Sequence, residues 1–99
     1  METSDRIVAA IQAHEPELRA AGIRALSLFG SVARGDERAD SDVDVVVHLD
    51  PDAHVGLVRF VALERRLSEL LGRTVQMLPE PVDSPRLKAY LERDRQRVF

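Results

Sequence analysis

The sequence has 99 residues, of which 44% are hydrophobic and 31% are charged. This length predicts one domain, spanning residues 1–99, and excludes two full domains. The absence of cysteine excludes a disulfide framework, a thiolate metal site and a cysteine nucleophile. The first ten residues lack the basic start and apolar run of a signal peptide, and the apolar runs fall far short of the roughly 20 residues that cross a bilayer. We therefore expect a cytoplasmic protein that does not bind membranes.

The net charge of −3 gives the whole chain no attraction to nucleic acid, so direct DNA binding is not expected. The charge is unevenly distributed, because residues 36–52 hold seven acids and one base. A solvated acidic loop is the ordinary explanation of such a run. A bound cation is the alternative explanation, since a cation would offset this local charge.

Two short helices are expected before residue 23. The first can be capped by Thr3 or Ser4. Proline fits the first turn of a helix but breaks a helix interior, so Pro16 is expected to open a second short helix that ends near Ala21, with Gly22 as its stop. The apolar residues of the first helix recur at helical spacing: Ile7, Val8 and Ile11.

Three strands are expected, at residues 23–29, 42–49 and 74–78. The second is β-branched and almost continuously apolar, which is typical of a strand covered on both faces. Residues 57–71 carry leucine, valine and phenylalanine at helical spacing, and Gly72 stands where a left-handed C-terminal cap belongs. This segment is predicted to be the main helix.

A last helix is expected to have Ser84 as its cap and Pro85 in its first turn. We expect exposed apolar side chains of this helix to contact a partner protein. Its apolar stripe would comprise Leu87, Tyr90, Leu91 and Val98.

The order of these elements predicts how the strands pair. A strand at 42–49, a helix at 57–71 and a strand at 74–78 form the pattern of a right-handed parallel crossover. About a dozen residues join the strands at 23–29 and 42–49, too few for a crossover helix, so these two strands should pair antiparallel. The sequence therefore predicts an α+β fold, a small mixed β-sheet with helices packed against it.

The residues suited to chemistry follow the first strand. Gly30 lets the backbone approach a ligand closely, and Ser31 adds a hydroxyl and an amide that can meet a phosphate. Asp42 and Asp44 stand two residues apart at the head of a strand, so their carboxylates should share one face and hold a hard cation such as Mg²⁺. Arg34 can contact a phosphate or brace the acidic segment. Together these residues predict a site where a phosphate and a cation meet.

Each of these features also has a simpler explanation. A Gly-Ser pair after a strand is usually a turn, Asp-x-Asp at a strand head is often a cap or a solvated edge, and a lone arginine is usually a surface ion pair of small energy. Their combination, in one order and one short window, favours the site.

The segment GSVARGDERADSDVD joins a Gly-Ser, an Arg-Gly and a Ser-Asp-x-Asp at the head of a strand. It resembles the motif of the minimal nucleotidyltransferase (MNT) branch of the DNA polymerase β-like nucleotidyltransferase superfamily. A weaker resemblance extends along nearly the whole chain. It includes the stretch ELLGRTVQML and the tail SPRLKAYLERDRQRVF. The resemblance implies the nucleotidyltransferase fold, with ATP as substrate and Mg²⁺ as cofactor.

By this resemblance, Asp42 and Asp44 would be the catalytic residues and would ligate two Mg²⁺ ions. Members transfer a nucleoside monophosphate from a nucleoside triphosphate to a hydroxyl group. Stand-alone members of this size resemble antitoxins that pair with small helical HEPN ribonuclease toxins, some of which they silence by adenylylating a tyrosine. The resemblance thus implies transfer of AMP to a toxin protein. The nucleotide-binding residues would be Gly30, Ser31, Arg34 and Ser41.

Gln76, in GRTVQML, stands where the resemblance implies a third carboxylate. An amide can offer an oxygen to a metal ion but no charge, and it cannot act as a base near neutral pH. Loss of one general base typically costs about 10²–10⁴ in rate. Glu80 or Asp83 could supply the missing acid. The alternative to an enzyme is therefore a catalytically impaired antitoxin that inhibits its toxin by binding.

Other functions fit less well. A transferase that acts on a small molecule needs an acceptor pocket, and 99 residues leave no second domain to form one. We assign no role to His14, His48 or His54, which stand in separate elements. Tyr90 is expected in the core or on a partner surface rather than as a site of modification.

Overall fold

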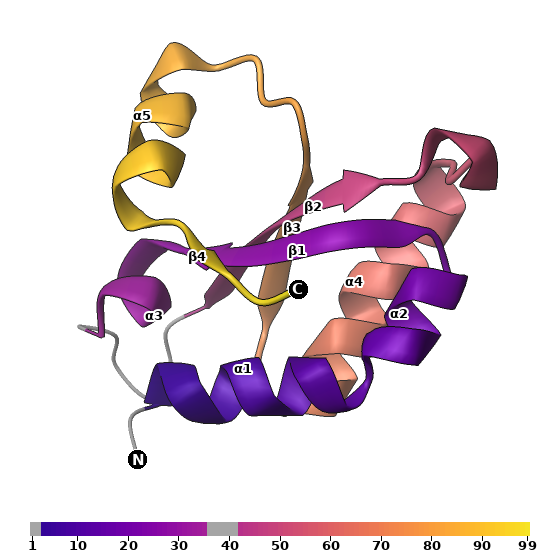
Figure 1. The fold of residues 1–99 in the computed structure, drawn as a ribbon, viewed down its shortest axis with the longest axis horizontal. Coiled ribbons are helices and arrows are strands. Elements are labelled where there is room, and N and C mark those ends of the chain that lie inside the picture. Colours follow the sequence, from indigo (N-terminus) through magenta and orange to yellow (C-terminus); the bar gives the residue numbers. More distant parts are fainter. Residues whose placement is uncertain (1–2, 36–41) are drawn as a thin grey trace.

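The computed structural model describes residues 3–35 and 42–99 of the chain. These residues form two successive helices, after which strands and helices alternate along the chain (Figure 1). In chain order the elements are α1 (Thr3–Ala13), α2 (Glu15–Ala20), β1 (Ile23–Phe29), α3 (Gly30–Arg34), β2 (Val43–Leu49), the 3₁₀ turn η1 (Pro51–Ala53), α4 (Leu57–Leu71), β3 (Val75–Pro79), α5 (Pro85–Asp94) and β4 (Gln96–Arg97).

The strands form a four-stranded sheet in the order β3-β2-β1-β4. β1 pairs antiparallel with both β2 and β4. β2 pairs parallel with β3, and α4 connects these two strands along the chain. The predicted α+β fold, the antiparallel pairing of the first two strands and the parallel crossover are therefore confirmed.

The sheet is covered unequally on its two faces. The helices α1, α2 and α4 lie on one face and α5 lies on the other (Figure 1). Side chains alternate along β2, so Val45 and Val47 enter the larger core with Leu67 of α4, whereas Val46 points to the opposite face and packs with Leu91 of α5. This alternation explains why the second strand reads as continuously apolar.

Predicted capping residues mark the helix ends in the structure. Gly72 follows α4 in the left-handed conformation, with a φ of 64°. The Ser84 hydroxyl accepts a hydrogen bond from the backbone N–H of Leu87 and so caps α5. None of the helices in the described ranges is long and apolar enough to cross a membrane.

The prediction for the last helix was wrong at its end. α5 stops at Asp94, and Gln96–Arg97 forms β4 along the free edge of β1. Val98 is buried in the larger core, and its backbone N–H donates to the carbonyl of Leu26 rather than continuing a helical stripe. Pairing with β4 satisfies backbone groups at the β1 edge, which a longer helix would leave unpaired.

The expected partner surface on the last helix also needs correction. Leu91 is only 4% exposed and Leu87 is partly buried, because both pack against Phe29 and Val46 of the sheet. Tyr90, at 39%, is the large apolar side chain that α5 leaves exposed.

Candidate active site

The first contact that builds the site joins the end of β1 to the start of β2. The antiparallel register places Asp44 opposite Phe29, directly beside Gly30. Gly30 has a φ of 76°, a conformation that favours glycine, and a Cβ atom there would lie 2.6 Å from Oδ2 of Asp44. Glycine is therefore required at this position both by its backbone conformation and by the carboxylate next to it. Ser31 is the next residue along α3.

A second contact joins β3 to the same end of the sheet. The parallel register pairs Asp44 with Gln76. The Gln76 side chain reaches past this pair, and its Nε2 donates a hydrogen bond of 2.9 Å to Oδ2 of Asp42, the residue just before β2. The structure thus brings together Gly30, Asp42, Asp44 and Gln76, four of the residues singled out in the sequence.

The two carboxylates influence each other electrostatically. Partial burial raises the pKa of Asp44, the charge of Asp42 raises it further, and the charge of Arg34 lowers it. Both aspartates are partly buried, so water screens their repulsion incompletely. A divalent cation between them would relieve this repulsion, and a pair of carboxylates is a suitable half-site for Mg²⁺.

Arg34 connects this end of the sheet to α5. Its Nη1 donates to Oδ2 of Asp94 at 2.9 Å. The Asp94 side chain is only 5% exposed, and hydrogen bonds from Arg93 and then Arg34 lower its pKa. Sequence reasoning missed Asp94, because its contact with Arg34 spans 60 positions and no local pattern marks it.

Two candidate replacements for the third carboxylate do not join the pair. The Glu80 carboxylate accepts hydrogen bonds from both terminal nitrogens of Arg95, so it is engaged in another ion pair. Asp83 is exposed in the loop before α5. Ser41 lies outside the described residues, so its predicted role is not placed. In the parts of the chain that the structure describes, no three His, Asp or Glu side chains gather closely enough to hold a metal ion.

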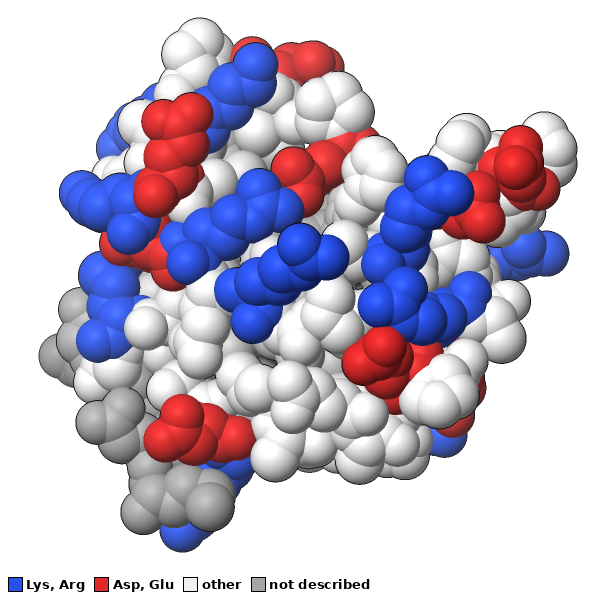
Figure 2. All heavy atoms as spheres, in the orientation of Figure 1, with Lys and Arg blue, Asp and Glu red and all other residues white. Residues whose placement is uncertain are grey.

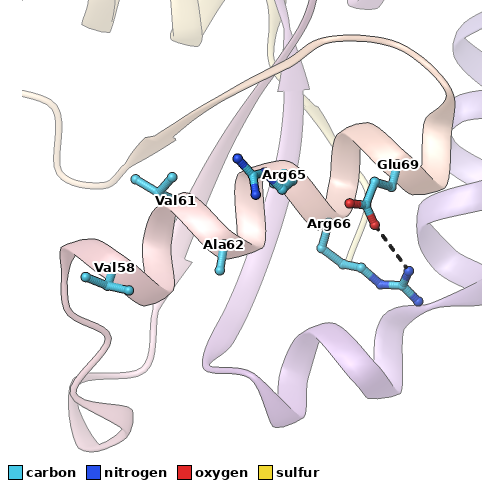
Figure 3. A pocket seen from close by; sticks show the side chains of 6 residues that line it. All are labelled: Val58, Val61, Ala62, Arg65, Arg66 and Glu69. Carbon is cyan, nitrogen blue, oxygen red and sulfur yellow. Dashed lines mark ion pairs between the residues drawn. The ribbon is translucent and has the colours of Figure 1, made fainter.

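A hollow elsewhere on the surface lacks comparable chemistry. It has a volume of about 400 Å³ and lies on the outer face of α4, with Val58 and Val61 at one end and the Arg66–Glu69 ion pair at the other (Figure 3). It contains no pair of carboxylates. The carboxylate pair beside Gly30 is therefore the candidate active site.

Comparison with known proteins gives a consistent result. The sequence pattern of the family described as "Nucleotidyltransferase domain" matches residues 11–98. The protein adenylyltransferase MntA of Thermococcus cleftensis is 39% identical over 79 residues, which are 79% of this chain and 78% of the relative.

Solved structures agree with this result. A structure described as a minimal nucleotidyltransferase superposes with a TM-score of 0.78 at 30% identity, over 97% of this chain and 95% of the other. A chain of the solved structure of the tri-AMPylated Shewanella oneidensis HEPN toxin in complex with MNT antitoxin superposes with a TM-score of 0.60 at 16% identity. The match covers 89% of this chain and 71% of the other and shows a shared fold.

Proposed function

Because the chain belongs to the nucleotidyltransferase domain family, and within it to the minimal nucleotidyltransferases, we propose that it transfers AMP from ATP to a hydroxyl group of a partner protein. The relative from Thermococcus cleftensis carries the name of a protein adenylyltransferase, which supports this choice of reaction. The partner is an HEPN-type toxin, and the chain is its antitoxin. The solved toxin–antitoxin complex that contains a chain of similar fold supports this choice of partner.

One observation carries the proposal: Asp42 and Asp44 lie together beside Gly30. Partial burial and then the charge of Asp42 raise the pKa of Asp44, which is the setting that a hard divalent cation stabilises. Asp42 and Asp44 would hold Mg²⁺. When bound, Mg²⁺ would offset the charge of the triphosphate and lower the pKa of the attacking hydroxyl.

The chain's own residues then bind and orient the reactants. The backbone at Gly30, free of a side chain, admits a phosphate close to the carboxylates, and the Ser31 hydroxyl can donate a hydrogen bond to it. Arg34, held by Asp94 at the edge of the site, can contact a second phosphate group. The acceptor oxygen forms a bond to the α-phosphorus, the bond to the β-phosphate oxygen breaks, and pyrophosphate leaves. The hydroxyl proton passes to solvent, because the Gln76 amide cannot accept it.

A second function is favoured by the hydrogen bond between Gln76 and Asp42. The amide N–H of Gln76 occupies one carboxylate oxygen of Asp42, where a second cation would otherwise bind. An amide also provides no base. The second candidate is therefore an antitoxin that keeps the fold and the nucleotide site but inhibits its toxin by binding.

Calorimetry with ATP tests the nucleotide site. The parent chain should bind ATP in the presence of Mg²⁺, and Asp42→Asn with Asp44→Asn should weaken binding at least about tenfold. Asp52→Asn with Asp83→Asn is the matched control, because it removes the same charge from exposed positions outside the site. Equal binding by the parent and the Asp42/Asp44 variant would show that the cation and the nucleotide bind elsewhere.

A further inference from the structure

The face of the sheet that carries Asp44 has a hollow at its other end. Along β1 this face presents two small side chains, Ala25 and Ser27. The register places His48 of β2 opposite Ala25 and Arg97 of β4 opposite Ser27. Small residues on the central strand and longer ones on its neighbours leave a depression of about 290 Å³, which we call the sheet hollow. It is lined by Ala25, Ser27, His48, Glu80, Arg95 and Arg97.

α5 does not cover this end of the sheet. Basic side chains gather in the middle of the view in Figure 2, near the place of β4 in Figure 1, below a notch between the segment that follows β3 and the end of β2. The sheet hollow is therefore open to solvent, although its floor at Ser27 is only 1% exposed.

The charges of the sheet hollow do not cancel. Arg95 is balanced, because its terminal nitrogens donate to Glu80 and its Nε donates to the Ser27 hydroxyl at 3.1 Å. The backbone of Arg97 pairs with β1, but its guanidinium makes no hydrogen bond or ion pair with any residue in the described ranges, and the same holds for the side chain of His48. One positive charge thus lies beside the depression without a counter-charge.

We propose that the sheet hollow is a binding site for a phosphate group, held by Arg97, His48 and Ser27. The guanidinium of Arg97 offers a planar fork that matches two phosphate oxygens. His48 can donate from its ring, and the Ser27 hydroxyl, which accepts from Arg95, keeps its own proton to donate. Donors from three strands thus face one depression, and its volume leaves room for the group esterified to the phosphate.

The sheet hollow is separate from the candidate active site. His48 and Asp44 stand four residues apart on β2, which corresponds to roughly 13 Å along the strand. Val46 lies between them under Leu91 of α5. Phosphate binding here therefore does not depend on Asp42, on Asp44 or on the proposed transfer reaction.

The nuclear magnetic resonance of the histidine rings tests the proposal. Inorganic phosphate is titrated against the protein in EDTA, at constant pH and constant ionic strength, so that the carboxylate pair has no cation and disfavours anions. The His48 ring signal, assigned with a His48→Gln variant, should shift and saturate, whereas the signals of His14 and His54 should not. Absence of a saturable shift at His48 would overturn the proposal.

Four variants locate the bound phosphate. Arg97→Ala should weaken the response at least about tenfold and Arg97→Lys should weaken it less, since lysine keeps the charge but loses the fork. Arg24→Ala is the matched control, because Arg24 is an exposed arginine of β1 outside the sheet hollow. Asp42→Asn with Asp44→Asn should leave the response unchanged. An unaltered response in Arg97→Ala, or its loss in the aspartate variant, would contradict the assignment.

The choice of anion distinguishes the source of the phosphate. Acetate should produce a weaker shift than phosphate, because it offers fewer oxygens to the three donors, and an equal shift would overturn the preference for phosphate. Tighter binding of O-phosphoserine than of inorganic phosphate would assign the site to a phosphorylated residue. Tighter binding of inorganic phosphate would assign it to the free anion.

Discussion

At the scale of single residues, the charge of the candidate site depends on the side chain at position 76, where Gln76 contacts Asp42. The amide donates one hydrogen bond to the Asp42 carboxylate. This bond partly offsets the repulsion between Asp42 and the nearby carboxylate of Asp44. A carboxylate at this position would instead add a third negative charge. The parallel register of Asp44 with Gln76 means that this charge would enter the same space as the first two.

Gln76→Asp should make the stability of the protein depend on Mg²⁺. In EDTA the variant should melt several degrees below the parent, through like-charge repulsion and loss of the hydrogen bond, and saturating Mg²⁺ should recover most of the difference. Gln76→Ala is the control, because it loses the same hydrogen bond but adds no charge. Mg²⁺ should therefore not reduce the difference in melting temperature between Gln76→Ala and the parent. Thermal melts that respond equally to Mg²⁺ in both variants would argue against a shared site.

Gly30 provides a second test at this scale. Gly30→Ala should lower the free energy of unfolding by about 1–3 kcal/mol, because it combines a strained φ with a close contact to Asp44. Gly35→Ala is the matched control, since Gly35 also has a positive φ, of 79°, but its added Cβ would meet no atom within 4 Å. The loss of unfolding free energy should be larger at Gly30 than at Gly35, and this difference should become smaller when Asp44 is also replaced by alanine. Equal costs at both glycines, measured by denaturant unfolding, would show that the Asp44 contact is unimportant.

At the scale of elements, α5 is tied to the candidate site through the ion pair between Asp94 and Arg34. The position of Asp94 depends on how α5 packs against Phe29 and Val46 of the sheet. This packing places the end of α5 beside α3, where Asp94 pairs with Arg34. The position of a predicted phosphate contact therefore depends on a helix that is distant in sequence.

Asp94→Asn should reduce stability at neutral pH by a few degrees of melting temperature. Hydrogen bonds from Arg93 and Arg34 lower the pKa of Asp94 in the folded state, so its stabilising contribution is present above the unfolded pKa of about 4 and is lost as the pH falls through the lower folded value. The melting temperatures of parent and variant should converge in acid. Asp83→Asn, at an exposed loop position, should not show this convergence, and a constant difference across pH in Asp94→Asn would contradict the assignment.

Local sequence signals predicted most of the elements and failed where the structure depends on distant partners. Gly72 and Ser84 mark helix ends because their backbone or side chain satisfies the neighbouring turn itself. The strand Gln96–Arg97 has two residues and exists because the edge of β1 offers backbone groups to pair. No pattern within so short a segment can show that edge.

The same distinction applies to the site. Asp44 and Gly30 were predictable, since alternation along a strand and a glycine after a strand are local features, and the register brings them together. The ion pairs of Asp94 with Arg34 and of Glu80 with Arg95 arise from how α5 packs on the sheet. Sequence reasoning therefore left Glu80 open as a replacement acid, whereas the structure shows it engaged by Arg95.

At the scale of the whole molecule, opposite charges occupy different parts of the chain. Residues 36–52 are strongly acidic, whereas residues 84–99 carry five basic and two acidic side chains. The candidate site lies at one end of β2, with Asp42 and Asp44 only partly buried, so a hydroxyl group of another protein can reach it. The proposed toxin partner would supply that hydroxyl.

Transfer of radiolabel from α-³²P ATP to the proposed HEPN-type toxin partner tests the central claim most directly. The parent should label the toxin slowly and only with Mg²⁺, Asp42→Asn with Asp44→Asn should abolish labelling, and Gln76→Asp should raise the rate by about 10²-fold or more by restoring a base and a second cation site. A toxin that binds the chain yet receives no label from either the parent or Gln76→Asp would contradict the claim and leave inhibition by binding as the function.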